Sequence, residues 1–417
     1  MPNHAANPSR CNPMNTASNA SGTMPHAAQP AVTAQANTKS RIRIATIDAL
    51  RGLIIFIMLF DHVRENFFAH VPITDPLTVS GSEPMLFFTR IAAHFVAPLF
   101  VFLAGLAAWL YEHPSSGETR PVTGFLLKRG IFLVFLELTV VNFAWYGIFP
   151  PTILFLQVIW VIGLSMIALA LLHRLPRWAL ATVGVALVFG HNLLTPIHFQ
   201  PDETGYSIWT ILHDRGFLIA DGPFKIKVSY PLLPWIGVIA LGYLAGPLFA
   251  KSFPANRRQR ALVWLGVGSL ALLAVIRGFN IYGETLPWVT GDNFVQTVMS
   301  WVNFTKYPPS LDFLLLTIGT GCLILAWFEM LDNWFMRVLV IFGSVPMFFY
   351  LFHLYLLLIM QTVLVATVGP TYGQRFGVDQ YWHIWVISFA LIPVLYFPMR
   401  AFARFKHSSK QAWVRYF

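Results

Sequence analysis

Charged residues are scarce in this chain. Asp, Glu, Lys and Arg make up 11% of its 417 residues, whereas 56% are hydrophobic. Because a soluble domain carries roughly 25% charged residues, this composition excludes a soluble globular protein. The apolar residues also come in blocks of about twenty, the length of a membrane-spanning helix, and not in the alternating segments of about ten that build a transmembrane barrel. The sequence therefore predicts an all-α, polytopic membrane protein.

Cysteine and the common catalytic signatures are also scarce or missing. Cys11 lies in a polar tail and Cys322 in an apolar segment, so neither a disulfide framework nor a cysteine metal site is expected. The chain has no HEXXH motif and no two histidines four residues apart, and we predict no metal. Walker, GXSXG and Gly-rich nucleotide motifs are absent. The net charge of +10 is explained first by the loop-charge bias of membrane proteins, so no nucleic-acid partner is expected.

The chain divides into a polar start and a long apolar remainder. Residues 1–40 have almost no charge and no apolar run, which predicts a disordered cytoplasmic tail or, equally, a misassigned start codon. Residues 41–417 are interpreted as a single transmembrane domain. About ten spans are expected in it, at residues 44–64, 86–111, 130–147, 152–172, 177–194, 231–250, 261–277, 311–330, 338–366 and 382–400.

The distribution of Lys and Arg predicts the orientation of these spans. With the N-terminus inside, nineteen of the 28 basic residues fall in inner segments and seven in outer loops. This bias predicts that both termini are cytoplasmic. The outer loops 65–85, 195–230 and 278–310 are long, and loops of this length commonly carry function.

The stretch 44–68 combines an apolar middle with ionisable residues at both ends. Each ionisable residue in a span costs roughly 2.5–3.5 kcal/mol on insertion scales, so such residues point to a functional site. Asp48, Arg51, Met58 and His62 fall on one stripe of a helix, and Arg51 and His62 are about 16 Å apart along its axis. One helix thus presents a cation near one leaflet and a proton-transfer group near the other.

Further polar residues cluster near the outer side of the expected spans. Asp61 adjoins His62, Arg90 and His94 share a helix face, and His353 lies in the middle of the ninth span. Histidine exchanges a proton near neutral pH, which suits catalysis. A structural explanation stays open for Arg90, His94 and His353 as hydrogen-bonding groups between helices.

Several segments resemble a known family. The first apolar segment is similar to the opening of the heparan-alpha-glucosaminide N-acetyltransferase catalytic-domain family, particularly its short bacterial members. The similarity lies in Ile47–Gly52 (IDALRG) and in Asp61 to Arg64 (DHVR). Phe87–Tyr111 resembles the second helix of that family, and Gly343–Leu356 a late helix. Separately, Arg51 and His62 match the Arg-X10-His signature of membrane acyltransferases that O-acetylate surface polysaccharides.

The resemblance implies a multi-pass transmembrane acyltransferase in a bacterial inner membrane. It would take an acetyl group from cytoplasmic acetyl-CoA, a co-substrate and not a bound cofactor, and deliver it to a hydroxyl or amine of a glycan or other sugar outside. The lysosomal enzyme has a catalytic histidine in the loop after its first helix, and His70 is the nearest match by position. The choice of base between His62 and His70 therefore stays open.

Acyl transfer needs a base, a stabiliser of the oxyanion and a held donor. Asp61 is expected to orient the base, and Arg90 to hold the oxyanion, with His94 and His353 as further candidates. Arg51 and Asp48, with Lys128 and Arg129, are the expected donor-binding residues at the cytoplasmic mouth.

Two other classes stay open. A transporter or flippase of a sugar-lipid would use the same intramembrane polar cluster as its pathway. A non-enzymatic, pH-responsive membrane protein would use the histidines as switches. The expected partners are a small-molecule or glycan substrate, the lipid bilayer and, in one arrangement, a second copy of the chain as a homodimer.

Overall fold

The computed structural model describes the backbone of residues 31–416, with side chains from residue 45 onward except those of residues 412 and 415. The chain forms two compact units, residues 1–39 and 40–417. Of the tail expected over residues 1–40, residues 1–30 lie outside the described part, and α1 already begins at Ala31. The cavities and the polar clusters of the protein belong to the larger unit.

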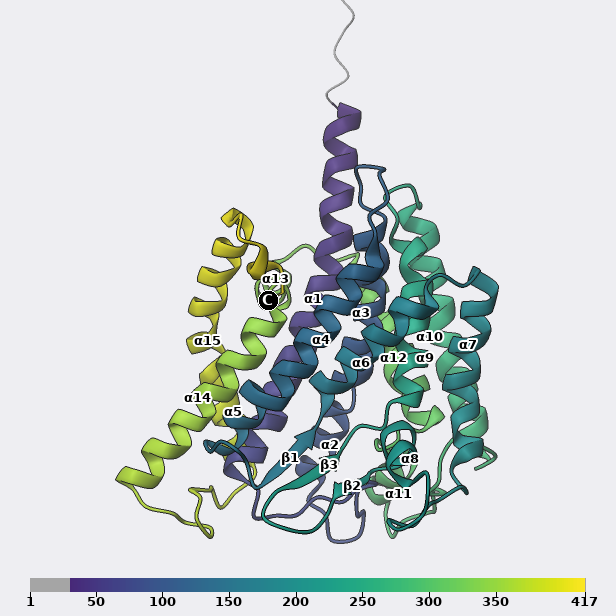
Figure 1. Cartoon of the computed structure of the whole chain (residues 1–417). Coiled ribbons are helices and arrows are strands. Elements are labelled where there is room, and N and C mark those ends of the chain that lie inside the picture. Colours follow the sequence, from purple (N-terminus) through teal and green to yellow (C-terminus); the bar gives the residue numbers. More distant parts are fainter. Residues whose placement is uncertain (1–30, 417) are drawn as a thin grey trace, which may run out of the picture. The chain divides into compact units, whose positions relative to one another are not determined.

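The described chain is mostly helical, as expected (Figure 1). Its α-helices are α1 (Ala31–Phe67), α2 (Pro84–Ala93), α3 (Val96–Glu112), α4 (Val122–Leu136), α5 (Asn142–Tyr146), α6 (Val158–Leu172), α7 (Arg177–Gly190), α8 (Tyr206–Leu212), α9 (Leu233–Ala245), α10 (Ala255–Gly278), α11 (Phe294–Trp301), α12 (Leu311–Phe328), α13 (Trp334–Gly343), α14 (Pro346–Thr367) and α15 (Trp382–Ser408). A π-helical turn, Glu137–Val141, joins α4 to α5.

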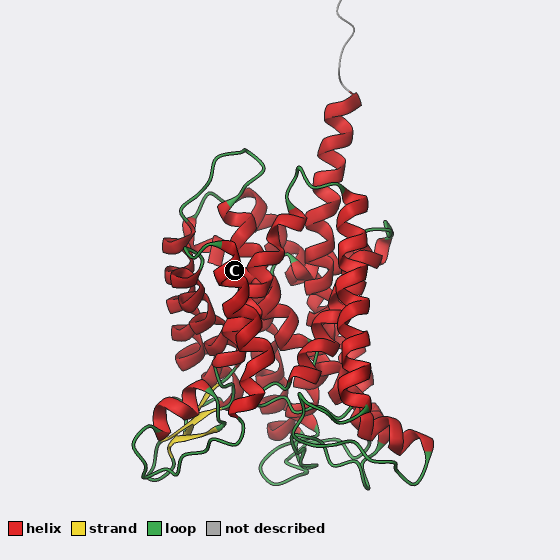
Figure 2. Ribbon diagram, turned by 90° about the vertical axis from the view of Figure 1, so that its right-hand side faces the viewer, coloured by secondary structure: helices red, strands yellow, loops and turns green. Residues whose placement is uncertain are grey.

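A small sheet, which the all-helical expectation left out, lies at one end of the helices (Figure 2). Strand β1 (Ile153–Leu156) pairs in parallel with β3 (Lys225–Val228), and β2 (Gly216–Ile219) pairs antiparallel with the other edge of β3. We call this end the sheet face. The opposite end, where α3 and α15 end and α4 begins, is called the entry face.

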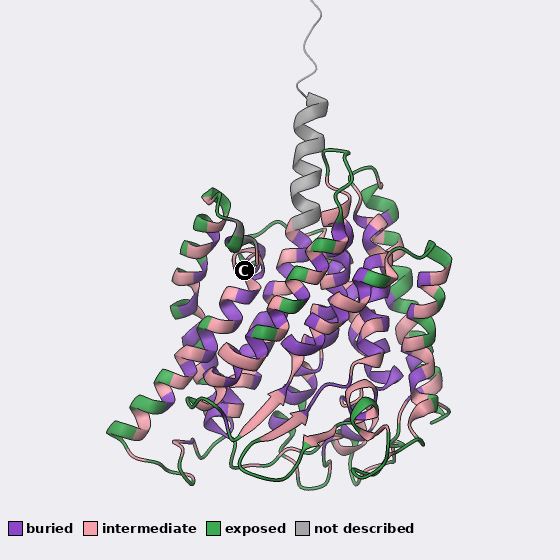
Figure 3. Ribbon diagram, in the orientation of Figure 1, coloured by how far each residue is buried: buried purple, intermediate pink, exposed green. Residues whose placement is uncertain are grey.

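Six of the described helical segments are long and apolar enough to cross a membrane. They are Pro84–Glu112, Arg177–Leu194, Ala255–Gly278, Leu311–Phe328, Pro346–Thr367 and Trp382–Ser408. Outward-facing residues on α7 and α10 are exposed although apolar, among them Trp178 and Trp264, which suits contact with lipid (Figure 3). The ninth expected span, 338–366, is divided between α13 and α14, because Pro346 starts a new helix there.

Glycine allows α1 and α13 to pack with their backbones in contact. A Cβ atom on Gly52 would overlap the carbonyl oxygen of Leu339, and one on Gly343 would overlap that of Asp48. Small residues at crossings of membrane helices let backbones approach in this way. The crossing holds the middle of α1 against α13, and so fixes the height of Arg51 and His62 within the helices.

Gly52→Ala is expected to destabilise the folded protein by about 1–3 kcal/mol, because the added methyl group forces α1 and α13 apart. Thermal unfolding in detergent measures the effect as a lowered midpoint. Gly268→Ala on α10 is the matched control, because its added Cβ meets no atom within 4 Å. Equal midpoints for the two variants would contradict the close crossing.

Candidate active site

Three cavities follow one another from the entry face toward the sheet face. The mouth, about 980 Å³, is lined by polar and charged residues that include Asp48, Arg51, Arg120, Lys128 and Lys406. A middle cavity of about 230 Å³ shares four wall residues with the mouth: Arg51, Ala107, Phe125 and Lys406. The two cavities are therefore adjacent.

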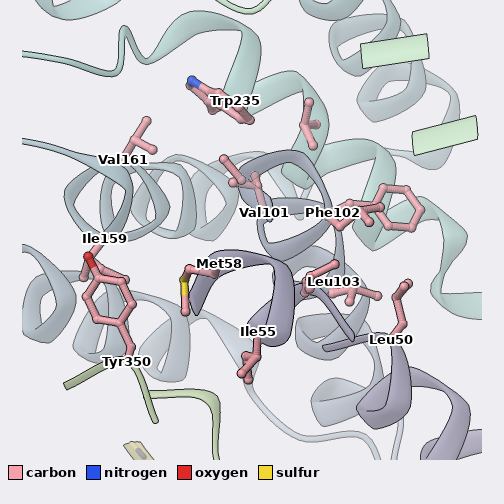
Figure 4. Close-up of a cluster of buried hydrophobic side chains, with 14 of the residues drawn as sticks. Leu50, Ile55, Met58, Val101, Phe102, Leu103, Ile159, Val161, Trp235 and Tyr350 are labelled. Carbon is pink, nitrogen blue, oxygen red and sulfur yellow. The ribbon is translucent and has the colours of Figure 1, made fainter. Parts of the chain in front are cut away.

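The middle cavity is mainly apolar. Met58 on α1, Ile159 on α6 and Tyr350 on α14 line it, and Figure 4 shows these side chains facing one another. Its far end shares Met58, Val96, Val158 and Tyr350 with a third cavity of about 60 Å³. We call this third cavity the chamber. Mouth, middle cavity and chamber together form a line of spaces that we call the tunnel.

The chamber is polar. Its lining includes Asp61, His62, Glu65, Arg90, Gln157, Tyr230, Lys306 and Tyr307. These residues come from α1, α2, the residue before α6, and the loops 195–230 and 278–310, and loop 278–310 is bonded to loop 65–85. The side chain of Asn303 bonds to both backbone groups of Leu77, and the Lys306 amide donates to Asp75 Oδ1 at 3.2 Å. Loops 65–85 and 278–310 are thereby held together beside the chamber.

His62 and His353 form a hydrogen-bonded pair across α1 and α14. His62 Nδ1 lies 2.7 Å from His353 Nε2, and His353 Nδ1 lies 2.7 Å from the carbonyl oxygen of Phe349. A carbonyl only accepts, so His353 Nδ1 carries the proton and the Nε2 of the neutral ring accepts from His62 Nδ1. This chain of bonds leaves the lone pair of His62 on Nε2. Since His62 lines the chamber, that atom is the basic position available there.

Asp61 bonds to arginines and not to His62. Its Oδ2 accepts from Arg90 Nη1 at 2.6 Å, and its Oδ1 from Arg64 Nε at 3.2 Å. Arg64 also donates to Glu65 at 2.9 Å. The contact that orients the His62 ring, which the sequence predicted for Asp61, thus comes from His353. Asp61 instead holds the Arg90 guanidinium against the chamber.

The expected donor-binding residues gather near the entry face. Asp48 and Arg51 are paired at 2.7 Å and line the mouth together with Lys128. Arg129 lines the middle cavity. The stripe of α1 seen in the sequence therefore follows the tunnel, because Arg51 lies at its beginning and His62 in the chamber.

Two histidine candidates lie elsewhere. His70 stacks on Tyr372, with ring centroids 3.6 Å apart, beside a separate surface cavity. His94 is buried near the Phe313 ring and does not line any of the three cavities of the tunnel. Neither residue lines the chamber.

Sequence reasoning missed several chamber residues. In the sequence Lys306 is one of seven basic residues in the expected outer loops, Tyr230 and Gln157 lie in no motif, and Tyr350 lies in Gly343–Leu356, where only His353 is expected at the site. The aromatic residues of the expected outer loops, Tyr307 among them, suit sugar stacking and also an interfacial aromatic belt. Within the described residues, no group of three or more His, Cys, Asp or Glu is arranged to hold a metal ion.

One family of known proteins matches the chain. The model of the family "Heparan-alpha-glucosaminide N-acetyltransferase, catalytic" matches residues 43–277, more than half of the chain. This segment contains α1 with His62, α2 with Arg90, and the walls of the tunnel contributed by α3, α4 and α6. No curated protein sequence matches significantly. The chain belongs to the heparan-alpha-glucosaminide N-acetyltransferase catalytic family.

Proposed function

We propose that the protein is a transmembrane acetyltransferase. It takes the acetyl group of cytoplasmic acetyl-CoA at the entry face and transfers it to a hydroxyl or amine of a glycan or other sugar at the sheet face. The family supports the reaction class. The observation that carries the direction of transfer is the tunnel, with a basic mouth at one end and a histidine chamber at the other.

The walls of the tunnel match the parts of acetyl-CoA in order. The phosphates would lie in the mouth near Arg51, Arg120 and Lys128, where cations attract anionic ligands. The pantetheine arm would pass between Met58, Ile159 and other apolar walls. About 16 Å of α1 separates Arg51 from His62, a distance that the extended arm can cover. The thioester would then arrive beside the chamber.

The histidine pair supplies the base. As the acceptor attacks the thioester carbon, its O–H or N–H proton passes to His62 Nε2, and the sulfur later leaves with that proton as the free thiol. His353 keeps the His62 ring in the required tautomer through the 2.7 Å contact. Arg90, held by Asp61, adds positive charge beside the reacting groups.

The proposal includes the placement in the membrane. Besides the six long segments, we propose that α1, α4 with α5, α6 and α9 also cross, which gives ten crossings. Both termini would then be cytoplasmic, in accord with the concentration of Lys and Arg on the inner side. The membrane would be a bacterial inner membrane. The shortness of α6 and α9 does not oppose this, because much of each helix is buried among its neighbours.

The test supplies purified protein in detergent with acetyl-CoA labelled in the acetyl group and with a panel of amino sugars and neutral sugars. The protein is expected to release free coenzyme A and to transfer the label to one class of acceptor. The reason is that the tunnel brings the thioester to a basic nitrogen. Thiol release and acceptor label are measured together. A wild-type protein that neither binds nor consumes acetyl-CoA would refute the proposal and favour transport of a sugar-lipid.

A further inference from the structure

Some of the charged side chains that line the chamber form ion pairs, and one does not. Arg90 is bonded to Asp61, and Glu65 to Arg64. For Lys306, by contrast, the described residues provide no carboxylate within 4.0 Å of its ammonium group. Lys306 is nevertheless buried, with 4% of its surface exposed. The chamber therefore contains a buried cation without a direct counter-ion.

Aromatic and backbone contacts hold Lys306 in place. Its ammonium lies 5.3 Å from the centroid of the Tyr307 ring, a cation–π contact, and its amide is bonded to Asp75. The Tyr307 hydroxyl donates to that of Tyr230 at 3.2 Å, which fixes the ring. Lys306 and His62 both line the chamber.

Asp61 and Glu65 line the same chamber and Asp75 accepts from the Lys306 amide, but none of these carboxylates bonds to the ammonium. A buried ammonium group without a bonded carboxylate is costly, and side chains of this kind are normally paired or neutralised. The cost is recovered if a negative charge arises beside the ammonium during the reaction. In acyl transfer such a charge forms on the carbonyl oxygen when the carbonyl carbon becomes tetrahedral. Preorganised positive charge at that position lowers the barrier, because no reorganisation is needed at the moment of reaction.

We propose that Lys306 is a catalytic residue whose ammonium stabilises the oxyanion of the acyl thioester, an inference that rests on the proposed acetyltransferase function. The acceptor oxygen or nitrogen bonds to the carbonyl carbon, the C=O electron pair moves to the oxygen facing Lys306, and the proton goes to His62 Nε2. The pair then returns, the C–S bond breaks, and His62 protonates the departing thiolate. Lys306 keeps its proton throughout.

The first test compares the effect of Lys306→Met on kcat with its effect on substrate binding. The expected result is a kcat about 10²–10³-fold lower, with the acceptor KM and the acetyl-CoA Kd near wild type, because the charge acts mainly in the transition state. Lys306→Arg is expected to restore part of kcat. Lys227→Met is the matched control, since Lys227 also lies over an aromatic ring, Phe217, but outside the chamber.

A binding test does not depend on turnover. S-carboxymethyl-coenzyme A carries a carboxylate one carbon farther from the sulfur than the thioester carbonyl, so its negative charge would lie close to where the oxyanion forms. It is expected to bind wild type more tightly than acetyl-CoA does and to lose that advantage in Lys306→Met, whereas Lys227→Met keeps it. An unchanged acetyl-CoA Kd in the variant also reports that the protein remains folded.

The possible failures are distinct. An unchanged kcat in Lys306→Met, with active wild type, overturns the role of Lys306 and leaves the acetyltransferase function standing. A defect confined to the acceptor KM also overturns it, because Lys306 would then bind an anionic group of the acceptor. A wild-type protein that does not consume acetyl-CoA overturns both proposals together.

Discussion

His62→Ala is expected to lower the rate of acetyl transfer by about 10²–10⁴-fold, the range for loss of a general base. The reason is geometric. His62 lines the chamber, and its Nδ1 is engaged with His353 at 2.7 Å, so that Nε2 is the atom available to take the acceptor proton. In the proposed mechanism the donor phosphates bind at the other end of the tunnel, so the affinity for acetyl-CoA is expected to stay near wild type.

The measurement is thiol release from acetyl-CoA by purified variants with equal thermal midpoints. His70→Ala distinguishes the two histidines that the sequence left open. Its ring stacks on Tyr372 away from the chamber, and we expect a change within about three-fold. His198→Ala, on the exposed outer loop, is the matched control. A large loss in His70→Ala with an active His62→Ala would contradict the assignment of the base.

His353 distinguishes a positioning role from a structural one. His353→Phe keeps an aromatic ring at this position but removes the nitrogen that accepts from His62 Nδ1–H. The tautomer of His62 is then no longer fixed. The expected result is a fall in kcat smaller than that of His62→Ala, without a change in the acetyl-CoA Kd. If the kcat of His353→Phe equals that of wild type, the pair has no part in catalysis.

Ala107→Trp is expected to reduce transfer by about 10²-fold or more. Ala107 lies in the wall that the mouth and the middle cavity share, where an indole would fill the passage. The thioester would then stop short of His62, and a misplacement of even about 1 Å can cost 10²-fold. Ala107→Ser, which adds little volume, is expected to remain active.

The measurement compares thiol release by these variants with that of Ala271→Trp. Ala271 is exposed on α10, outside the tunnel, so the same change in size leaves the passage open. Thermal midpoints identify any variant that has lost its fold. Full activity in a folded Ala107→Trp protein would mean that the donor reaches His62 by another route.

Local patterns in the sequence predicted the parts of this structure that depend on one segment alone. The apolar blocks predicted membrane helices, and the eleven-residue spacing of Arg51 and His62 placed both on one face of α1. These inferences work because helix geometry and transfer free energies act within a single element.

The rest depends on contacts between distant segments. His353 follows His62 by 291 residues, and nothing near either residue indicates that their rings meet. Asp61 adjoins His62 in sequence, but consecutive residues point to different sides of a helix, and Arg90 is the partner that Asp61 contacts. In the sequence Lys306 is an ordinary loop cation, and its place in the chamber depends on how loop 278–310 packs against loop 65–85. The sheet was missed because its strands have only four residues each.

The central claim is that an acetyl group crosses the membrane through the tunnel. Proteoliposomes with one orientation of the protein test it directly, with labelled acetyl-CoA supplied only to the entry face and a sugar acceptor only to the sheet face. We predict labelled acceptor at the sheet face and free coenzyme A at the entry face, with both lost in Ala107→Trp. Label that appears only when donor and acceptor share one side would contradict the account.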